Sequence, residues 1–360
     1  MKKIEEIDRN FMVQTGLNNQ NAKLYDVCEE PFRVFGVFKP EHEEDCFHRL
    51  PYEVAKAVSE GVEGLHVHTA GGRVRFATDS DYVGIVADIH SASKGSKSMF
   101  INNAGFDLYF EDQGVLRKVI TYVPPFDVEE RYSGEIYIKE NQMREYTLYL
   151  PSYGGVKHLY IALDKNATVR PCKDYSDPSP ILYYGSSITQ GACASRPGMI
   201  YQNIIQRRLD LDYINLGFSG CALAEDAIAE YIAKQKMRIF VYDYDYNAPD
   251  CAYLEKTHEK MFRMVREANP NLPIVCMSMP APSYLGEQSQ LERKEIVKRT
   301  YDKAIEAGDK SVYFIDGFDF SKELGAGDDI FVDFGHPNDL GFFCMANRIE
   351  RELRKILENS

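Results

Sequence analysis

The chain has 360 residues, of which 44% are hydrophobic and 27% charged, and its formal net charge is −13. This is the composition of a soluble globular protein long enough for two domains, and its acidic balance disfavours non-specific binding to nucleic acid or acidic lipid. No run of sequence approaches the roughly 18 apolar residues of a membrane span, so no membrane partner is expected.

The first eight residues, from Met1 to Asp8, carry acids where a secretory signal would have an apolar core. A cytoplasmic location is therefore expected, unless a leader has been removed. Eight cysteines are scattered along the chain with no CxxC motif and no Cys/His pair at zinc spacing. In a reducing compartment they are most simply buried small hydrophobes. Cys193 and Cys221 fall close to the motifs below, which leaves open that they line a site.

The first half of the chain reads as short strands. Runs of β-branched and aromatic residues are separated by Gly, Pro, Asn and Asp, which favours an antiparallel β-sandwich. The strands are expected at residues 74–78, 82–87, 119–123, 135–138 and 146–150. Residues 51–59 are expected to form a short helix at the edge of this sandwich. We divide this half into an N-terminal extension (1–28), a sandwich domain (29–170) and a linker rich in Pro, Ser and Asp (171–179).

The second half, residues 180–360, alternates buried strands with amphipathic helical stretches. Five strands are expected at residues 181–184, 213–216, 237–242, 273–278 and 312–315, and a last helix at about 340–357. Alternation at this spacing predicts an α/β fold, a five-stranded parallel sheet with helices on both faces. In such sheets, ligands bind at the carboxyl ends of the strands.

Polar or small residues follow several of these strands. The first is a serine in the turn Gly185-Ser186-Ser187, which leads from a strand into a helix. After the second strand, Gly220 can bring a backbone N–H close to a ligand because it has no side chain. After the third, the amide of Asn247 is a neutral donor for a developing oxyanion.

The last of these residues precede the final helix. Asp333 stands three residues before His336, so its carboxylate can accept from Nδ1–H and leave Nε2 as a base. Taken singly, each of these side chains would be an ordinary turn or capping residue. Their occurrence in one order at successive strand ends favours a catalytic site.

These four blocks resemble the SGNH/GDSL hydrolase family over residues 180–358. The resemblance implies a flavodoxin-like α/β/α domain with Ser187 as nucleophile, His336 as base oriented by Asp333, and oxyanion donors at Ser187 N–H, Gly220 and Asn247. It also implies that no cofactor is needed.

Two further motifs are similar to one branch of that family. Residues 105–109 read Gly-Phe-Asp-Leu-Tyr, like the signature of the jelly-roll domain that precedes the hydrolase domain in this branch, and residues 193–198 also look typical of it. What the branch implies is esterase chemistry, with removal of small acyl groups, acetyl above all, from carbohydrate. The expected partner is a small-molecule or oligosaccharide ester, and the oligomeric state is left open.

The chain departs from the family pattern in two places. The usual Asp before the nucleophile is Ser186 here, so the nucleophile must be chosen between adjacent serines, and matching Gly-x-Ser favours Ser187. The third block usually reads Gly-x-Asn-Asp, but here it is Asp245-Tyr246-Asn247-Ala248, which leaves the oxyanion geometry open.

Several other assignments compete with this interpretation. Asp243, Asp245 and Asp250 could form a hard-metal site, but without His partners or metal-loop spacing we predict no metal. Arg196 is a candidate substrate contact because it follows the nucleophile turn, although a salt-bridge role is the commoner one. Thioesterase or lysophospholipase activity is the alternative reaction, and a non-catalytic glycan-binding protein is the alternative of another class.

Overall fold

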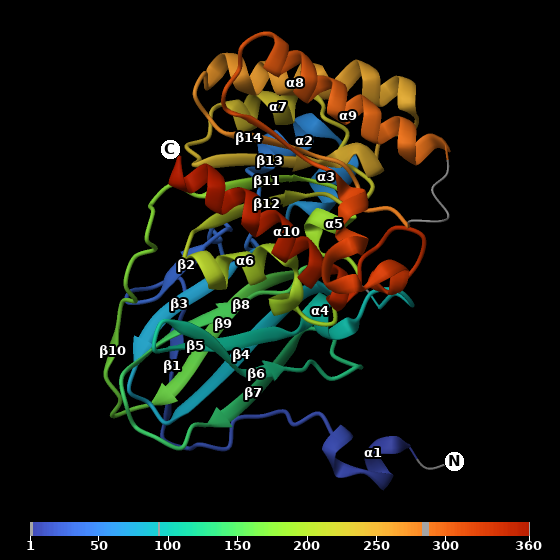
Figure 1. The fold of residues 1–360 in the computed structure, drawn as a ribbon. Helices are drawn as coiled ribbons and strands as arrows, with labels where there is room; N and C mark the ends of the chain where they lie inside the picture. Colours follow the sequence, from blue (N-terminus) through green and yellow to red (C-terminus); the bar gives the residue numbers. More distant parts are fainter. Residues whose placement is uncertain (1–2, 93, 283–287, 360) are drawn as a thin grey trace.

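The computed structural model describes residues 3–92, 94–282 and 288–359. It consists of an antiparallel β-sandwich followed by a parallel α/β domain (Figure 1). The fold class predicted from the sequence is therefore confirmed.

The sandwich is built from two antiparallel sheets whose apolar side chains alternate inward, as residues such as Val74, Phe76, Val83 and Ile85 do. One sheet has the order β1 (Ala22–Asp26), β9 (Gly154–Asp164), β4 (Tyr82–Ala92) and β7 (Arg131–Tyr137). The other has the order β10 (Val169–Arg170), β3 (Arg73–Thr78), β8 (Arg144–Tyr149), β5 (Phe106–Asp112) and β6 (Val115–Tyr122), and β2 (Arg33–Phe35) pairs with β3.

Some strands of the sandwich were not expected from the sequence. Strand β1 lies inside the segment 1–28 that we predicted to be an extension, and it pairs along its whole length with β9. Strand β5 carries three acids, a residue type depleted in strands, so its pattern is weak. Strand β9 begins with two glycines and carries Lys157 and His158, which interrupt its apolar run.

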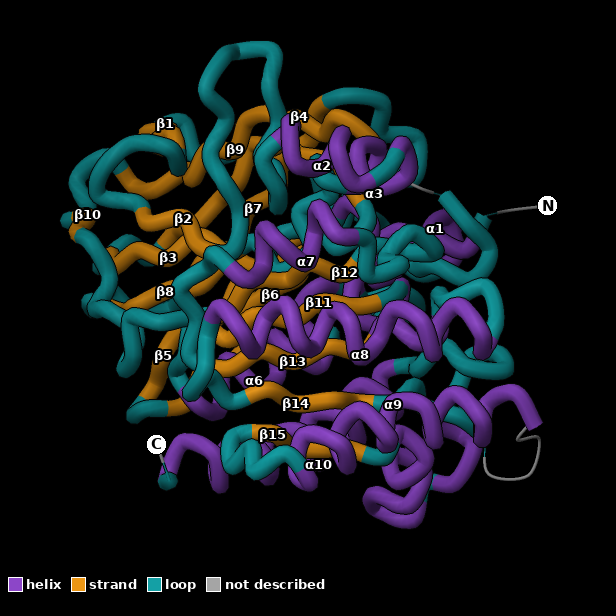
Figure 2. Tube along the Cα trace, turned by 90° about the horizontal axis from the view of Figure 1, so that it is seen from above, coloured by secondary structure: helices purple, strands orange, loops and turns teal. Residues whose placement is uncertain are grey.

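The parallel sheet has the strand order β12 (Tyr213–Gly217), β11 (Ile181–Gly185), β13 (Ile239–Asp243), β14 (Ile274–Met277) and β15 (Val312–Ile315). Figure 2 shows these strands side by side. All five lie where the sequence predicts them. Alternate residues of β11 face opposite ways, with Leu182 and Tyr184 in one apolar core and Ile181 and Tyr183 in another.

Helices fill both cores, as expected for a parallel sheet. One face is covered by α7 (Asp226–Ala233), α8 (Cys251–Ala268) and α9 (Gln288–Glu306), and the other by α6 (Tyr201–Leu209) and α10 (Asp339–Glu358). The remaining short elements are α1 (Ile4–Ile7), η1 (Arg9–Phe11), α2 (Tyr52–Val58), α3 (Glu60–Leu65), α4 (Phe100–Ala104), α5 (Ser187–Gln190), η2 (Pro197–Met199), η3 (Tyr244–Tyr246), η4 (Gly317–Gly325) and η5 (Gly327–Ile330).

The helix that we predicted at residues 51–59 is present as α2, but it does not lie at the edge of the sandwich. A second helix, α3, follows it, α2 packs against α7, and Leu50, Ala55 and Val62 are buried in the apolar core that α7, α8 and α9 cover. This segment therefore belongs to the sandwich half by sequence and to the α/β domain by packing. The apolar face of a short helix can be recognised in the sequence, but the pattern does not indicate which domain packs against that face.

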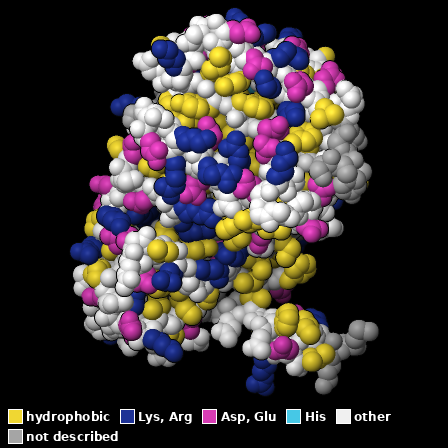
Figure 3. Space-filling model, viewed as in Figure 1, with side chains coloured by type: hydrophobic (Ala, Val, Ile, Leu, Met, Phe, Trp, Pro, Cys, Tyr) yellow, Lys and Arg dark blue, Asp and Glu magenta, His cyan; other side chains and the backbone are white. Residues whose placement is uncertain are grey.

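The surface in Figure 3 shows a band of Lys and Arg side chains across the middle of one face. Helices α6 and α10 lie on the near side in the same view (Figure 1). Their arginines form ion pairs with carboxylates in Arg208–Glu350, Arg348–Glu352, Arg351–Glu323 and Arg354–Glu350. In the part of the chain that the structure describes, no helix is both long enough and apolar enough to cross a membrane.

Candidate active site

The nucleophile turn lies between β11 and α5. Strand β11 ends at Gly185, and Ser186 is the N-cap of α5, its hydroxyl accepting from the backbone N–H of Ile188 at 3.2 Å. Ser187 is the first residue of the helix, and its Oγ lies 2.9 Å from Nε2 of His336. The two adjacent serines therefore differ in their contacts: Ser186 caps the helix, and Ser187 faces the histidine.

Gly185 is required by the close approach of Asp243 beneath this turn. A Cβ at Gly185 would overlap the Asp243 carboxylate and the Thr189 hydroxyl, which are hydrogen-bonded to each other. Burial raises the pKa of Asp243 well above its ordinary value, and the Thr189 hydroxyl only partly offsets this. Asp243 therefore stabilises the turn by accepting a hydrogen bond from Thr189 and packing against Gly185.

His336 is held by the loop between η5 and α10. Its Nδ1 lies 3.0 Å from Asp333 Oδ1 and 3.1 Å from Oδ2, and Oδ1 also accepts the backbone N–H groups of His336 and Gly335 at 2.9 and 3.1 Å. With Nδ1–H directed at the carboxylate, Nε2 is free to accept the Ser187 proton. The ring of Tyr246 packs edge-on against His336, with centroids 5.5 Å apart.

Asp333 is kept ionised by its surroundings. Partial burial raises its pKa, but the ammonium of Lys97, the backbone N–H groups and the positive form of His336 outweigh burial and hold the pKa well below the usual range. Lys97 comes from the sandwich domain, and its Nζ lies 2.8 Å from Asp333 Oδ2. Sequence reasoning missed Lys97, because a lone lysine 236 positions away from its partner carries no motif.

The loop after β12 presents Gly220 with φ of 70°. In the described ranges 3–92, 94–282 and 288–359, no acceptor is found for its N–H. The neighbouring Phe218 carbonyl is fully occupied: it accepts from the backbone of Cys221 and Ala222 and from Asn247 Nδ2, the last at 3.0 Å. Asn247 is thus hydrogen-bonded to the same loop, at Phe218, which stands two residues before Gly220. The structure brings these two predicted oxyanion residues together.

Tyr153 is a second residue near the site that sequence reasoning missed. It lies in the loop between β8 and β9 of the sandwich, and its hydroxyl donates to the Ser187 carbonyl at 3.2 Å. Burial raises its pKa. The sandwich domain therefore contacts both the nucleophile turn, through Tyr153, and the histidine loop, through Lys97.

Arg196, the candidate substrate contact, forms the salt bridge that we gave as the commoner role. Its Nη1 donates to Asp107 Oδ2 at 2.7 Å and to the Tyr109 hydroxyl at 2.9 Å, and Nη2 contacts Met199 Sδ at 3.2 Å. Asp107 is fully buried. The two motifs that the sequence marked, residues 105–109 and 193–198, thus bind each other across the domain joint. Arg196 is occupied there because a buried carboxylate needs a charged partner.

The three aspartates considered for a metal site each have another role. Asp243 accepts from Thr189, Asp245 Oδ2 accepts from the Met279 N–H at 3.0 Å, and Asp250 is the N-cap of α8. Within the described residues, no group of three or more His, Cys, Asp or Glu side chains is arranged to hold a metal ion.

The two cysteines near the motifs have different surroundings. Cys193 is buried at φ of 68°, and its pKa is raised to about 11 by burial and then by the nearby Asp333. Its thiol therefore stays protonated and unreactive at neutral pH. Cys221 packs against Gly61 of α3, where a Cβ on the glycine would overlap the sulfur.

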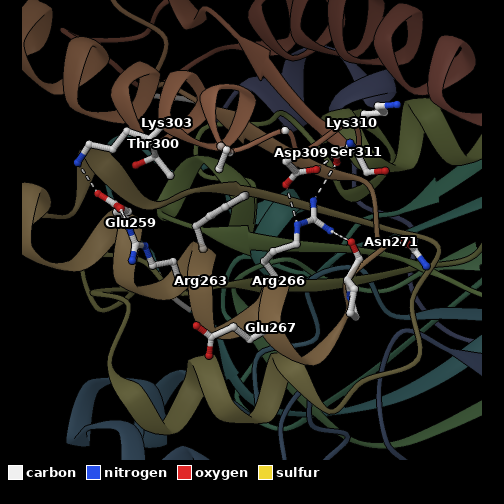
Figure 4. A pocket seen from close by; sticks show the side chains of 15 residues that line it. Glu259, Arg263, Arg266, Glu267, Asn271, Thr300, Lys303, Asp309, Lys310 and Ser311 are labelled. Carbon is white, nitrogen blue, oxygen red and sulfur yellow. Dashed lines mark hydrogen bonds and ion pairs between the residues drawn. The ribbon is translucent and has the colours of Figure 1, made fainter.

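A hollow of about 670 Å³ lies between α8 and α9, away from these residues (Figure 4). It is lined by paired charges, among them Lys303–Glu259 and Arg266–Asp309. Its wall includes Asn271 and Ser311, which come just before β14 and β15. It therefore opens at the amino ends of the strands, whereas Ser187 follows the carboxyl end of β11.

Two family models match the chain. Residues 178–354 match the GDSL-like Lipase/Acylhydrolase family, and residues 22–169 match the N-terminus of the SGNH-hydrolase-type esterases. No curated protein matches the chain.

Solved structures cover both domains. A protein from Bacteroides ovatus described as a GDSL-like lipase is 25% identical, with 94% of this chain and 98% of that chain covered and a TM-score of 0.83. A salicylyl-acyltransferase from a tetracycline biosynthetic pathway is 17% identical, with the same coverage and a TM-score of 0.76. An acetyl xylan esterase from Butyrivibrio proteoclasticus is 13% identical, with 94% and 99% covered and a TM-score of 0.59.

Proposed function

This chain belongs to the GDSL-like lipase/acylhydrolase family and is an ester-bond hydrolase, and we propose that its substrates are small acyl esters, acetyl esters above all, of carbohydrates. The observation that best supports this reaction is a pair of hydrogen bonds. Ser187 Oγ lies 2.9 Å from His336 Nε2, and His336 Nδ1 lies 3.0 Å from Asp333 Oδ1.

In the proposed mechanism, Ser187 Oγ attacks the ester carbonyl carbon while His336 takes its proton. The negative charge on the carbonyl oxygen is met by the N–H groups of Ser187 and Gly220 and by the Asn247 amide. The protonated His336 then gives its proton to the departing alcohol, which leaves an acyl-enzyme. Water, activated by His336, hydrolyses this ester and restores Ser187. Asp333, ionised because of its low pKa, balances the charge on the imidazolium in both steps.

Aromatic side chains near the histidine loop support a carbohydrate substrate. Phe334, between Asp333 and His336, is 72% exposed, an arrangement suited to stacking on a sugar face. Phe126, on the sandwich side, is also exposed and packs edge-on against Phe100, at the end of the loop that carries Lys97 to Asp333. Relatives of similar architecture that act on carbohydrate, such as the acetyl xylan esterase, favour the same substrate class.

Two substrate series test this proposal. The first consists of p-nitrophenyl esters from acetyl to dodecanoyl, for which we expect kcat/KM to fall as the acyl chain lengthens. The second consists of acetylated oligosaccharides, from which we expect acetate release. Ser187→Ala should abolish both activities, while Ser186→Ala should weaken only the helix cap. Preference for long acyl chains would contradict the small-acyl proposal and favour a lysophospholipase.

The carbohydrate part of the proposal is tested by Phe334→Ala. We expect this variant to raise KM for acetylated oligosaccharide and to leave kcat/KM for p-nitrophenyl acetate nearly unchanged. The matched control is Phe11→Ala, which removes another exposed phenylalanine in a segment distant from the site (Figure 1). Equal effects of the two variants, or no effect of Phe334→Ala on the sugar ester, would argue against sugar stacking at the histidine loop.

A further inference from the structure

One buried arginine of the sandwich half reaches the loop that carries the oxyanion donor. Arg49 precedes α2 and is only 1% exposed. Its Nη1 donates to the carbonyls of Gly217 at 2.5 Å and Asn215 at 3.2 Å, both in the last residues of β12. Its other donors hold its own half of the chain: Nε binds the His68 carbonyl at 2.7 Å, and Nη2 binds the Leu65 carbonyl at 2.9 Å.

All four acceptors of Arg49 are backbone carbonyls, and no carboxylate in the described residues forms an ion pair with it. Burial lowers the pKa of the guanidinium to about 9. A buried charge without a counter-ion is costly, and an apolar side chain would fill a domain joint at lower cost. An arginine here therefore serves a purpose other than filling space.

The residues after Gly217 indicate that purpose. The guanidinium also lies over the ring of Phe218, with its Cζ 4.6 Å from the ring centroid. Two backbone N–H groups of the loop are also bound: Phe218 N–H donates to the Gly185 carbonyl at 2.9 Å, and Ser219 N–H donates to the side-chain oxygen Oε1 of Gln190 at 3.0 Å. With its neighbours held in this way, Gly220 keeps its N–H unpaired in the described part of the chain.

We propose that Arg49 is a positioning residue for the oxyanion donor Gly220, which it holds in place through the Asn215 and Gly217 carbonyls and the Phe218 ring. This inference rests on the proposed function. The sandwich half of the chain is then part of the catalytic apparatus, because it supplies the group that fixes the oxyanion loop.

The chain contains a matched control. Arg73 is also a fully buried arginine of the sandwich that reaches β12, but at the opposite end of the strand. Its Nη2 binds the Asp212 carboxylate and donates to the Tyr213 carbonyl at 3.0 Å, and its Cζ lies 4.0 Å from the Tyr213 ring. Replacing Arg73 disturbs the same joint and the same strand without touching the residues next to Gly220.

The experiment compares Arg49→Lys and Arg49→Met with Arg73→Lys and Arg73→Met in the full chain. Each variant is measured for kcat and KM on p-nitrophenyl acetate, for affinity toward a boronic acid that forms a tetrahedral adduct with the serine, and for its unfolding midpoint. Loss of one oxyanion donor costs about 10²–10³-fold in rate. In the Arg49 variants, a displaced donor should therefore lower kcat by about 10- to 100-fold and change KM by no more than about twofold. The affinity for the boronic acid should fall by about the same factor as kcat.

The Arg73 variants should lose stability but keep kcat within about threefold of the parent chain. Arg49→Lys should retain more activity than Arg49→Met, because an ammonium can still bind one or two of the carbonyls. If Arg49→Met does not fold, Arg49→Lys decides the question.

A double-mutant comparison separates positioning from general loosening. The loss of kcat in the double variant Arg49→Lys/Asn247→Ala should be smaller than the product of the two single losses, because both residues act on one oxyanion site. In Arg73→Lys/Asn247→Ala, the two single losses of kcat should multiply. The inference is overturned if Arg49→Lys leaves kcat and boronic acid affinity near those of the parent, or if the Arg73 variants lower them equally. Failure of the parent chain itself to hydrolyse any ester would instead overturn the proposed function.

Discussion

The joint between the domains gives a sharp test of stability. Asp107 is fully buried and accepts from Arg196 Nη1 and Gly198 N–H, each at 2.7 Å, and from Thr121 Oγ1 at 2.5 Å. In Asp107→Asn, one oxygen becomes an amide nitrogen that can only donate. If that nitrogen takes the Oδ2 position, it faces the Arg196 and Gly198 donors. If it takes the Oδ1 position, the Thr121 hydroxyl can turn to accept from it, but the Arg196 guanidinium has still lost its counter-ion.

The expected cost is large because the pair is buried. Removing one partner of a buried ion pair costs about 3–5 kcal/mol of unfolding free energy. Asp112→Asn, on the same strand β5, is the control. Asp112 pairs with Arg117 at 2.6 Å, but both side chains are well exposed, so its loss should cost at most about 1 kcal/mol.

The assay is urea unfolding followed by circular dichroism, because the chain has no tryptophan to report by fluorescence. Arg196→Met completes a double-mutant cycle with Asp107→Asn, and we expect a coupling energy of at least about 1 kcal/mol between them. If Asp107→Asn lost no more stability than Asp112→Asn, Asp107 and Arg196 would not form the buried clamp that their geometry describes.

Two further predictions concern the active site and the pH dependence of stability. Asp333→Asn should lower kcat by about 10³–10⁴-fold with little change in KM, because a neutral amide cannot balance the imidazolium; a loss below tenfold would count against the role of Asp333. Burial lowers the pKa of His258 from 6.5 to about 3, so between these values the unfolded chain binds a proton that the folded chain does not. Stability should therefore fall as pH drops below about 6.5, by up to about 1.4 kcal/mol per pH unit from this group. His258→Gln should reduce that slope in urea unfolding measured from pH 7 to 4, and an unchanged slope would assign it to other residues.

Within the α/β domain, much of the fold could be predicted from the sequence. The five parallel strands lie where the apolar runs are, because a strand buried on both faces must be apolar along its whole length. The sandwich was predicted less completely. Strands β5 and β9 carry charged or glycine residues that break the alternation, and β1 is recognised only through its pairing with β9.

The candidate site shows the same division. Ser187, Gly220, Asn247 and His336 each follow a strand or precede a helix, and parallel strands bring such positions to one edge of the sheet. Their meeting could therefore be predicted. The motif favoured Ser187 over Ser186 as the nucleophile, and only the structure shows that Ser186 caps α5 while Ser187 faces His336.

Within the α/β domain, the sequence by itself determined the succession of the five strands, the parallel sheet and the residues at its carboxyl edge, because these depend on patterns that repeat within a few residues. Only the tertiary structure decided the contacts across the joint. Arg49 binds the carbonyl of Gly217, which is 168 positions away in the sequence, and Lys97 binds Asp333, which is 236 positions away. Arg196 binds Asp107, 89 positions away. Such pairs leave no periodic signal, since each is specified by how two separately folded surfaces fit together.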